Sequence, residues 1–287
     1  MFHPERDCNP FFHFFESLWM LAGRNDLAFP EHFVKRMRTF SDDGETLHGA
    51  YGHRWRVHFG FDQLPPIALA LKENPDDRRN VLQMWDAEVD LARVGKDVPC
   101  NTQCYFTRDA DGALDMTVCN RSNDVVWGAY GANAVHFSYL QEYVAYLIGC
   151  PVGRYWQISN NFHGYLDTIN PLSMLRDQVA DGYRKETCPY SMSWVKPFPL
   201  ANPDTPPEIW QQDLNLFLEE GPIIGFREPF FRKVATPLWM AHEAFKRNSG
   251  EERYTTTLEI LQQCRATDWR RACEEWVQRR YDKWKLR

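Results

Sequence analysis

The beginning of the chain has hydrophobic side chains on nearly every side of a predicted helix. They are Phe11, Phe12, Phe14, Phe15, Leu18, Trp19 and Leu21. Asn9 and Pro10 are residue types that favour a helix cap and a first turn. Within the helix stands Glu16, whose carboxylate costs free energy there unless it is hydrogen-bonded, paired or protonated. Glu16 is therefore either an ion-pair partner of an arginine such as Arg24 or Arg54, or a catalytic carboxylate.

The middle of the chain predicts helices alternating with strands. Helices are predicted over residues 30–39, 67–72, 134–148 and 172–183. Strands are predicted over residues 80–85 and 153–159. Another strand is predicted to end at residue 108 and to be joined by a glycine-containing turn to a strand over residues 114–120, as in a hairpin. Residues 187–207 are rich in proline and predict an irregular surface segment, and residues from 229 onward predict a set of helices.

Composition narrows the class of protein. The 287 residues are 44% hydrophobic, enough for one large domain or two modest ones. A net charge of −6 argues against a general nucleic-acid surface. No apolar run reaches membrane-spanning length and no leader is visible, so a cytoplasmic protein is expected. The eight cysteines lack metal-type spacing, so reduced thiols and no metal are expected. Because the first helix follows Met1 almost at once, a missing or alternative N-terminal segment is also considered.

The candidate chemistry centres on Pro99-Cys100. Proline restricts the backbone, so the thiol that follows it has a fixed direction. A single cysteine is more often a small buried side chain than a nucleophile. The neighbouring patterns favour the nucleophile: Arg78-Arg79 before it and Arg121-Ser122 after it supply guanidinium groups suited to phosphate oxygens.

Several motifs occur in a characteristic order along the chain. They are Glu16-Ser17-Leu18-Trp19 with Ala22-Gly23-Arg24-Asn25, Tyr51-Gly52 with Trp55-Arg56, Asp77-Arg78-Arg79, Pro99-Cys100, Arg121-Ser122-Asn123-Asp124, Asn133, and His163 with Tyr165. Together they resemble the thymidylate synthase family, which includes the deoxypyrimidine hydroxymethylases, over residues 9–170. The resemblance implies a single domain of residues 1–287, with a divergent helical part over 171–287. It also implies an α+β fold with a large mixed β-sheet covered by helices, and a homodimer in which two such sheets pack back to back.

The resemblance also implies roles for residues. Cys100 would add to C6 of a pyrimidine nucleotide, and Glu16 would act as general acid and base through ordered water. Asp124 would take part in catalysis and contact 5,10-methylenetetrahydrofolate, the one-carbon donor, and no metal is implied. The remaining roles are phosphate binding by Arg121 and Ser122, phosphate binding across the two-fold axis by Arg78 and Arg79, base recognition by Asn133, sugar binding by His163 and Tyr165, and folate binding by Trp19 and Tyr51.

The sequence departs from the family pattern where the product is decided. Asn101 stands where the family has histidine, and Met37 and Phe40 stand at two tryptophan positions of the folate site. The phosphate-binding arginine that the family has further upstream is absent unless Arg6 replaces it. The Arg121–Asn133 segment is one residue longer than in the family. Trp284–Arg287 stand where the synthases have an apolar C-terminal tail. A site open to water favours a 5-hydroxymethyl product from dUMP. The alternatives are a thymidylate synthase, a dCMP or CMP hydroxymethylase, and an inactive nucleotide- or RNA-binding paralogue.

Overall fold

The computed structural model describes residues 6–169 and 189–286 of the chain. It divides into two compact units, one over Phe12–His163 and the other formed by the chain up to Phe11 together with Gly164 onward. The single domain predicted from the sequence stays a prediction, and the helix predicted over residues 172–183 lies outside the described residues.

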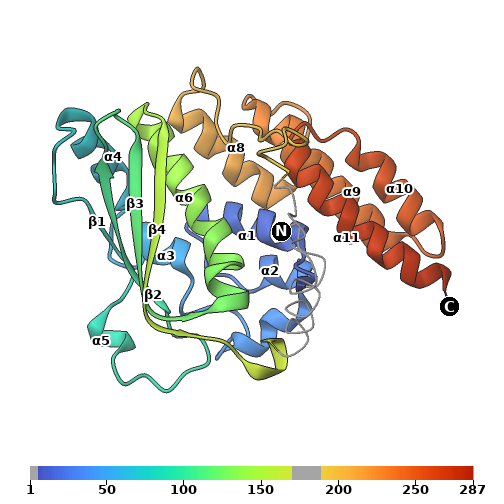
Figure 1. Ribbon diagram of the computed structural model, residues 1–287, viewed down its shortest axis with the longest axis horizontal. Coiled ribbons are helices and arrows are strands. Elements are labelled where there is room, and N and C mark those ends of the chain that lie inside the picture. Colours follow the sequence, from blue (N-terminus) through green and yellow to red (C-terminus); the bar gives the residue numbers. More distant parts are fainter. Residues whose placement is uncertain (1–5, 170–188, 287) are drawn as a thin grey trace. The chain divides into compact units, whose positions relative to one another are not determined.

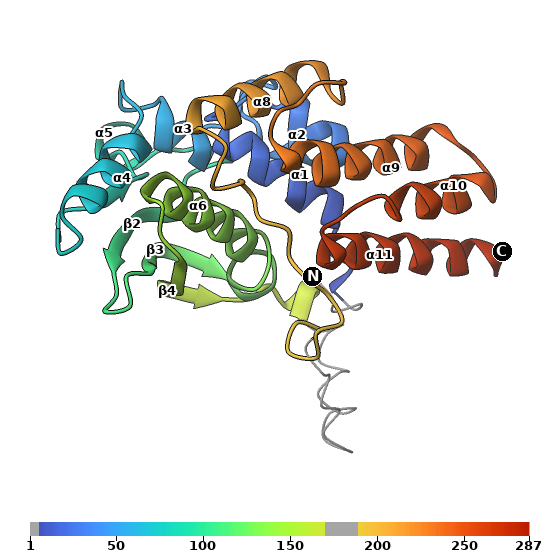
Figure 2. The same cartoon turned by 90° about the horizontal axis from the view of Figure 1, so that it is seen from above.

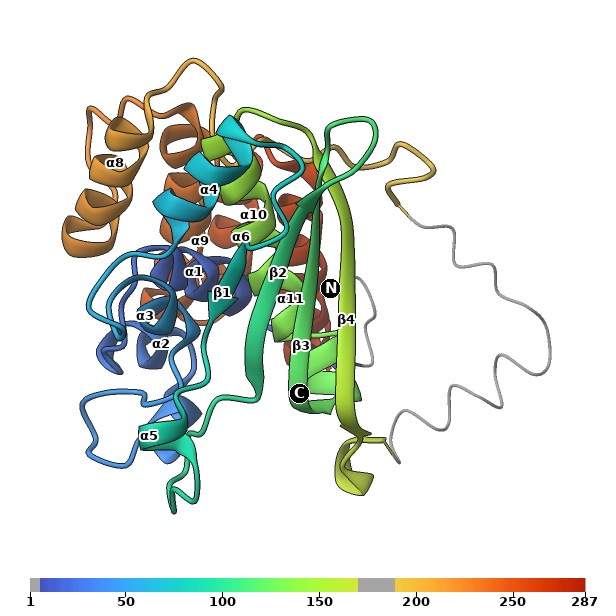
Figure 3. The same cartoon turned by 90° about the vertical axis from the view of Figure 1, so that its left-hand side faces the viewer.

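The Phe12–His163 unit is built on a four-stranded sheet, shown in Figures 1 and 3. Its strands lie in the order β1 (Val81–Gln83), β2 (Asn101–Arg108), β3 (Leu114–Asp124) and β4 (Val152–His163). β1 with β2, and β2 with β3, pair antiparallel, whereas β3 and β4 pair parallel. The predicted hairpin and the mixed sheet of an α+β fold are confirmed.

Helices cover one face of this sheet: α3 (Tyr51–Arg56) packs on β1, α4 (Leu64–Glu73) packs on β1 and β2, and α6 (Ala132–Ile148) packs on β3 and β4. The chain also forms α1 (Pro10–Leu21) and α5 (Ala87–Asp90), and α5 lies beyond the end of the sheet in Figure 3. In Figure 2, α6 lies on one side of β3 and β4, and no helix of the same unit covers the opposite side. That face carries exposed apolar side chains, among them Trp156 at 53% and Ile158 at 60% exposure. A large apolar face left bare on one unit is a candidate interface.

Some local predictions were wrong. The single helix over residues 30–39 is an α-helix, α2 (Ala28–Phe33), followed by the 3₁₀ helix η2 (Lys35–Phe40), because Val34 between them is extended. α3 was not predicted as a helix. A π-helical turn, η3 (Val125–Ala129), follows β3, and the N–H of Tyr130 donates to the carbonyl of Val125 (3.3 Å). A π-helical turn accommodates the extra residue of the Arg121–Asn133 segment, because its hydrogen bonds join residues five positions apart instead of the four of an α-helix.

The other unit is helical, as predicted for residues from 229 onward. It contains α8 (Pro207–Glu220), η4 (Phe231–Ala235), α9 (Thr236–Arg247), α10 (Glu252–Leu261) and α11 (Thr267–Lys285). α8 was not predicted, and residues 189–206 are irregular as expected. Within the described residues, no helix is both long and apolar enough to cross a membrane.

Candidate active site

Cys100 lies directly before β2, and its backbone is held from two sides. The hydroxyl oxygen of Tyr51 on α3 accepts hydrogen bonds from the N–H groups of Cys100 (3.2 Å) and Asn101 (3.3 Å). From β3, the N–H of Arg121 donates to the Cys100 carbonyl (2.9 Å). The direction of the thiol is therefore fixed by α3 and β3 as well as by the buried Pro99.

The charge environment of the thiol is mixed. Burial raises the pKa of Cys100, the guanidinium of Arg121 opposes this shift, and Asp97 adds to it. The Nη2 of Arg121 lies 3.9 Å from Sγ, and the guanidinium also donates to the carbonyls of Val98 (3.0 Å) and Pro99 (2.8 Å). Positive surroundings were expected from several arginines, and in this chain a single one contacts the sulfur among the described residues. The unliganded site therefore favours a neutral thiol.

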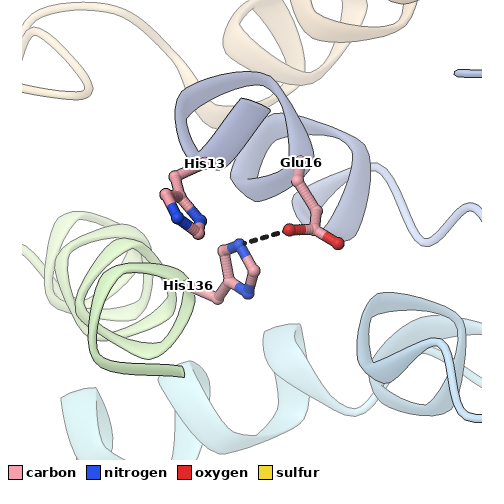
Figure 4. Close-up of side chains that lie close together, drawn as sticks. All are labelled: His13, Glu16 and His136. Carbon is pink, nitrogen blue, oxygen red and sulfur yellow. Dashed lines mark ion pairs between the residues drawn. The ribbon is translucent and has the colours of Figure 1, made fainter. Parts of the chain in front are cut away.

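Glu16 is buried on α1, and its partner is an imidazole. The Nε2 of His136 on α6 lies 2.9 Å from the Glu16 Oε2 (Figure 4). Of the two alternatives for Glu16, the arginine partner is not found, because Arg24 binds Asp26 (2.6 Å) and Arg54 binds the carboxylate of Asp90 (2.9 Å). His136 was missed because it is far from Glu16 in the sequence and becomes its neighbour only through helix packing.

The ends of β3 and β4 bring further predicted residues together. In the parallel register, Asp124 lies opposite His163, and Ser122 is two positions earlier on β3. One carboxylate oxygen of Asp124 accepts from the N–H groups of Val126 and Trp127 in the π-helical turn, while the other, Oδ2, is buried and has no hydrogen-bond partner among the described residues. A buried acceptor of this kind can receive a donor from a ligand or a water molecule.

Asn133 stands in the first turn of α6 and is directed at β3. Its Nδ2 donates to the Oδ1 of Asn123 (3.3 Å), and the Nδ2 of Asn123 donates to Gln157 and Ser159 on β4 (3.0 Å each). Asn123, Gln157 and Ser159 were not among the predicted site residues. The signal for them was the polar side chains at alternating positions of a strand.

Other predicted site residues lie elsewhere. Arg78 and Arg79 are exposed before β1, Arg79 binds Asp77 (2.8 Å), and neither contacts the Cys100 thiol. Tyr165 is exposed and belongs to the other unit. Trp19 is 1% exposed, and its indole N–H donates to Asp26 (3.1 Å). Because this ring is part of the core, its position does not support the predicted contact with the folate.

Comparisons with known proteins place the sequence in one family. The family model described as thymidylate synthase matches residues 10–186. A deoxyuridylate hydroxymethyltransferase of Pseudomonas phage M6 is 55% identical over 98% of this chain and 80% of its own length. The deoxyuridylate hydroxymethyltransferase of Bacillus phage SP01 is 36% identical over 75% of this chain and 58% of its own length. A solved structure, the thermostable thymidylate synthase A from Bacillus subtilis, matches with a TM-score of 0.49 and 23% identity over 57% of this chain and 60% of that chain.

Proposed function

This chain belongs to the thymidylate synthase family, and we propose that it is a deoxyuridylate 5-hydroxymethyltransferase that uses 5,10-methylenetetrahydrofolate as the one-carbon donor. The observation that carries the proposal is the 55% identity, over nearly the whole chain, to a phage enzyme of that name. The placement of Cys100 beside Arg121 supports it.

The proposed chemistry begins with Cys100. C5 of a pyrimidine is a poor nucleophile, and addition of the thiolate to C6 makes C5 enolate-like so that it can take up the one-carbon unit. The nucleotide phosphate would be bound by Arg121 and Ser122 together with Arg78 or Arg79 of a second subunit. The guanidinium groups of both subunits would supply the positive surroundings that a thiolate requires.

Asp124 fits the expected folate contact. Its unpartnered, buried Oδ2 is an acceptor suited to an N–H donor of a pterin ring. The donor supplies a one-carbon unit at the oxidation level of formaldehyde. Asp124, at the end of β3, would orient it. Met37 and Phe40 on η2 stand where the family has tryptophans, and a looser folate site favours entry of water.

Asn133 supports uracil as the base. An amide can accept from N3–H and donate to O4, a pattern that cytosine does not offer. The hydrogen bond to Asn123 fixes which way this amide is presented. His163, opposite Asp124, would contact the sugar hydroxyl, and the same role for Tyr165 remains a prediction.

A homodimer belongs to the same proposal. The exposed apolar face of β4, with Trp156 and Ile158, is suited to back-to-back packing against a second copy. Arg78 and Arg79 stand exposed outside the Cys100 site of their own chain, as expected of residues that serve a partner's site.

The product identifies the activity. The protein is incubated with the folate donor and with dUMP, dCMP or CMP in turn, and the nucleotide mass is measured. We expect 5-hydroxymethyl-dUMP, released with tetrahydrofolate. A 5-methyl product with stoichiometric dihydrofolate would show a methyl-forming synthase instead. Trapping with 5-fluoro-dUMP and the donor should label the protein covalently but not its Cys100→Ser variant, and absence of the adduct in both would indicate an inactive paralogue.

A further inference from the structure

We propose that His13, Glu16 and His136 form a binding site for one divalent transition-metal ion, of which zinc suits it best, and that zinc bound there inhibits the enzyme by occupying Glu16. The metal site itself rests on the geometry and chemistry of the three side chains. Its inhibitory effect rests on the proposed function and on the acid–base role expected for Glu16 within it.

The three side chains converge from two helices of the same compact unit. His13 and Glu16 are three positions apart on α1, a spacing that places both on one face of a helix, and His136 stands on α6. Each offers one ligand atom, and these atoms all lie within 4.8 Å of one another. Figure 4 shows both imidazole rings beside the carboxylate. The cluster is held by the packing of α1 on α6, where the rings of Phe14 and Tyr139 also meet, with centroids 6.1 Å apart.

The close approach of His136 to Glu16 is not that of a hydrogen-bonded pair. The Nε2 of His136 lies 2.9 Å from the Oε2 of Glu16, yet this nitrogen is buried and has no hydrogen-bond partner among the described residues. The two atoms are therefore near each other without being aligned as donor and acceptor. Ligands of one metal ion have this relationship, because each lone pair is directed at the ion and neighbouring ligand atoms lie about 3 Å apart around it.

The two imidazole rings also have an arrangement suited to a common ion. The centroids of His13 and His136 are 6.0 Å apart and the rings are tilted by 54°, so they converge without stacking. Each nitrogen of such a pair would lie roughly 2.0–2.1 Å from a zinc ion.

The donor set selects the class of ion. Two imidazole nitrogens and one carboxylate oxygen are the protein ligands of many zinc sites, in which a water molecule takes the fourth position. Magnesium and calcium prefer oxygen ligands, so both are disfavoured by the two nitrogens. The three ligands include no cysteine, which is why the spacing of the cysteines gave no sign of this site.

Burial gives the cluster a reason to bind a cation. The exposed fractions are 6% for His13, 7% for Glu16 and 3% for His136. A buried carboxylate has to be paired or bound to a metal, and the two arginines considered as its partners bind aspartates instead. A divalent cation would neutralise the carboxylate, and the two imidazoles would complete its protein ligands.

A bound zinc ion would change what Glu16 can do. A carboxylate accepts a proton through a lone pair, and in the occupied site that lone pair is directed at a cation whose charge makes the carboxylate a weaker base. Zinc would therefore withdraw Glu16 from acid–base catalysis. Because the thiolate of Cys100 is also a zinc ligand by its chemistry, the test has to separate the two positions.

Binding is tested with the metal alone. Protein treated with a chelator and dialysed is titrated with zinc chloride in a calorimeter, and its metal content is then measured by elemental analysis. We expect one tightly bound zinc ion per chain in wild type and in Cys100→Ser, and no tight binding of magnesium. His13→Gln and His136→Gln should each weaken zinc binding roughly 100-fold or more. His53→Gln, which changes an imidazole on α3 outside the cluster, is the matched control and should bind zinc as wild type does.

Activity tests the consequence of binding. One equivalent of zinc should abolish formation of the hydroxymethyl product by wild type, and a chelator should restore it. His13→Gln should keep measurable activity that the same zinc concentration does not inhibit. Alkylation of Cys100 should proceed at the same rate with and without zinc, because its thiol is not a ligand.

Wild-type protein without tight zinc binding would overturn the proposal, and so would equal zinc affinity in wild type and both histidine variants. Zinc that protects Cys100 from alkylation, or that inhibits His13→Gln equally, would place the inhibitory ion at the thiol. Loss of activity on removal of zinc would also contradict inhibition. A protein inactive on every nucleotide would contradict the proposed function, while the calorimetry would still decide the metal site. If a histidine variant does not fold, Glu16→Gln replaces it, and unchanged zinc affinity in that variant would reject the site.

Discussion

The guanidinium of Arg121 lies 3.9 Å from the sulfur of Cys100, and Arg121 belongs to β3, which pairs with the strand that Cys100 directly precedes. Its position is set by three hydrogen bonds to the Val98–Cys100 backbone, of which two come from the side chain. The reactivity of the thiol therefore depends on a contact built into the sheet.

Replacing Arg121 should make Cys100 less reactive even without substrate. Because the positive charge lowers the pKa of Cys100, Arg121→Gln should reduce the thiolate fraction. The rate of alkylation of Cys100 at neutral pH should fall roughly three- to tenfold, measured by mass spectrometry of the Cys100 peptide. Arg108→Gln, a change at the other end of β2 where the guanidinium binds the Gly112 carbonyl, is the matched control. Equal rates in the Arg121 variant and wild type would contradict the prediction.

Asp97→Asn should have the opposite effect on Cys100. Burial raises the pKa of Asp97, so folding favours its neutral form. The stability from this shift is present at low pH and is lost as the pH rises through the raised pKa. The variant should therefore unfold at a higher temperature than wild type at neutral pH, and the difference should shrink toward about pH 4. Thermal unfolding across pH measures this, and faster alkylation of Cys100 should accompany it. A rise in the unfolding temperature that does not depend on pH would contradict the prediction.

Tyr51→Phe should destabilise the backbone at the nucleophile. The variant removes the acceptor of two N–H groups, those of Cys100 and Asn101, and leaves them unsatisfied in a buried place. A loss of about 1–3 kcal/mol in the free energy of unfolding is expected. Chemical denaturation measures it, with Tyr105→Phe on the exposed face of β2 as the control. An equally stable Tyr51 variant would mean that water replaces the hydroxyl without loss.

Asn133→Asp should change which base is accepted. A carboxylate cannot donate to O4 of uracil, and when protonated it can pair with N3 and the amino group of cytosine. We expect kcat/KM for dUMP to fall by about 100-fold or more, and the ratio of dCMP to dUMP turnover to rise. Competition between the two nucleotides, read by product mass, gives the ratio directly. Unaltered discrimination would remove Asn133 from base recognition.

Glutamate substitutions on the exposed apolar face of β4 should prevent dimer formation. Wild-type protein should sediment at twice the chain mass of 33.9 kDa, and Trp156→Glu with Ile158→Glu should sediment as a monomer without activity. Leu69→Glu, at a similarly exposed position on α4, is the control and should stay dimeric. Mixing Cys100→Ser with an Arg78/Arg79 double alanine variant should restore part of the activity if sites are shared. A monomeric and active wild type would reject the dimer.

Much of the sheet could be predicted because its signals are local. The hairpin of β2 and β3 has a glycine turn between alternating strands, and α6 has apolar residues at helical spacing. α3 could not be predicted, since Tyr51–Arg56 is short and mixes aromatic and basic residues, and its helical form depends on burial of Arg54 and Trp55.

In the candidate site, too, the residues placed by local patterns could be predicted and those placed by helix packing could not. Cys100 and Arg121 could be placed together because both flank a predicted hairpin. The partner of Glu16 could not, since it is decided by how α1 and α6 pack. The burial of Trp19 in the core was also not visible in the sequence, and its folate contact stays a prediction. Long-range packing, which a single sequence does not display, accounts for these differences.

The π-helical turn after β3 has a consequence for how this scaffold varies. Successive residues of an α-helix are rotated by roughly 100° about its axis, so an added residue would normally turn everything that follows out of phase. By absorbing the addition before Ala132, the turn lets the segment between Asp124 and α6 change length while the rotational setting of Asn133 and His136 is preserved. Insertions and deletions during divergence can thus be tolerated at this point without moving the residues of the candidate site.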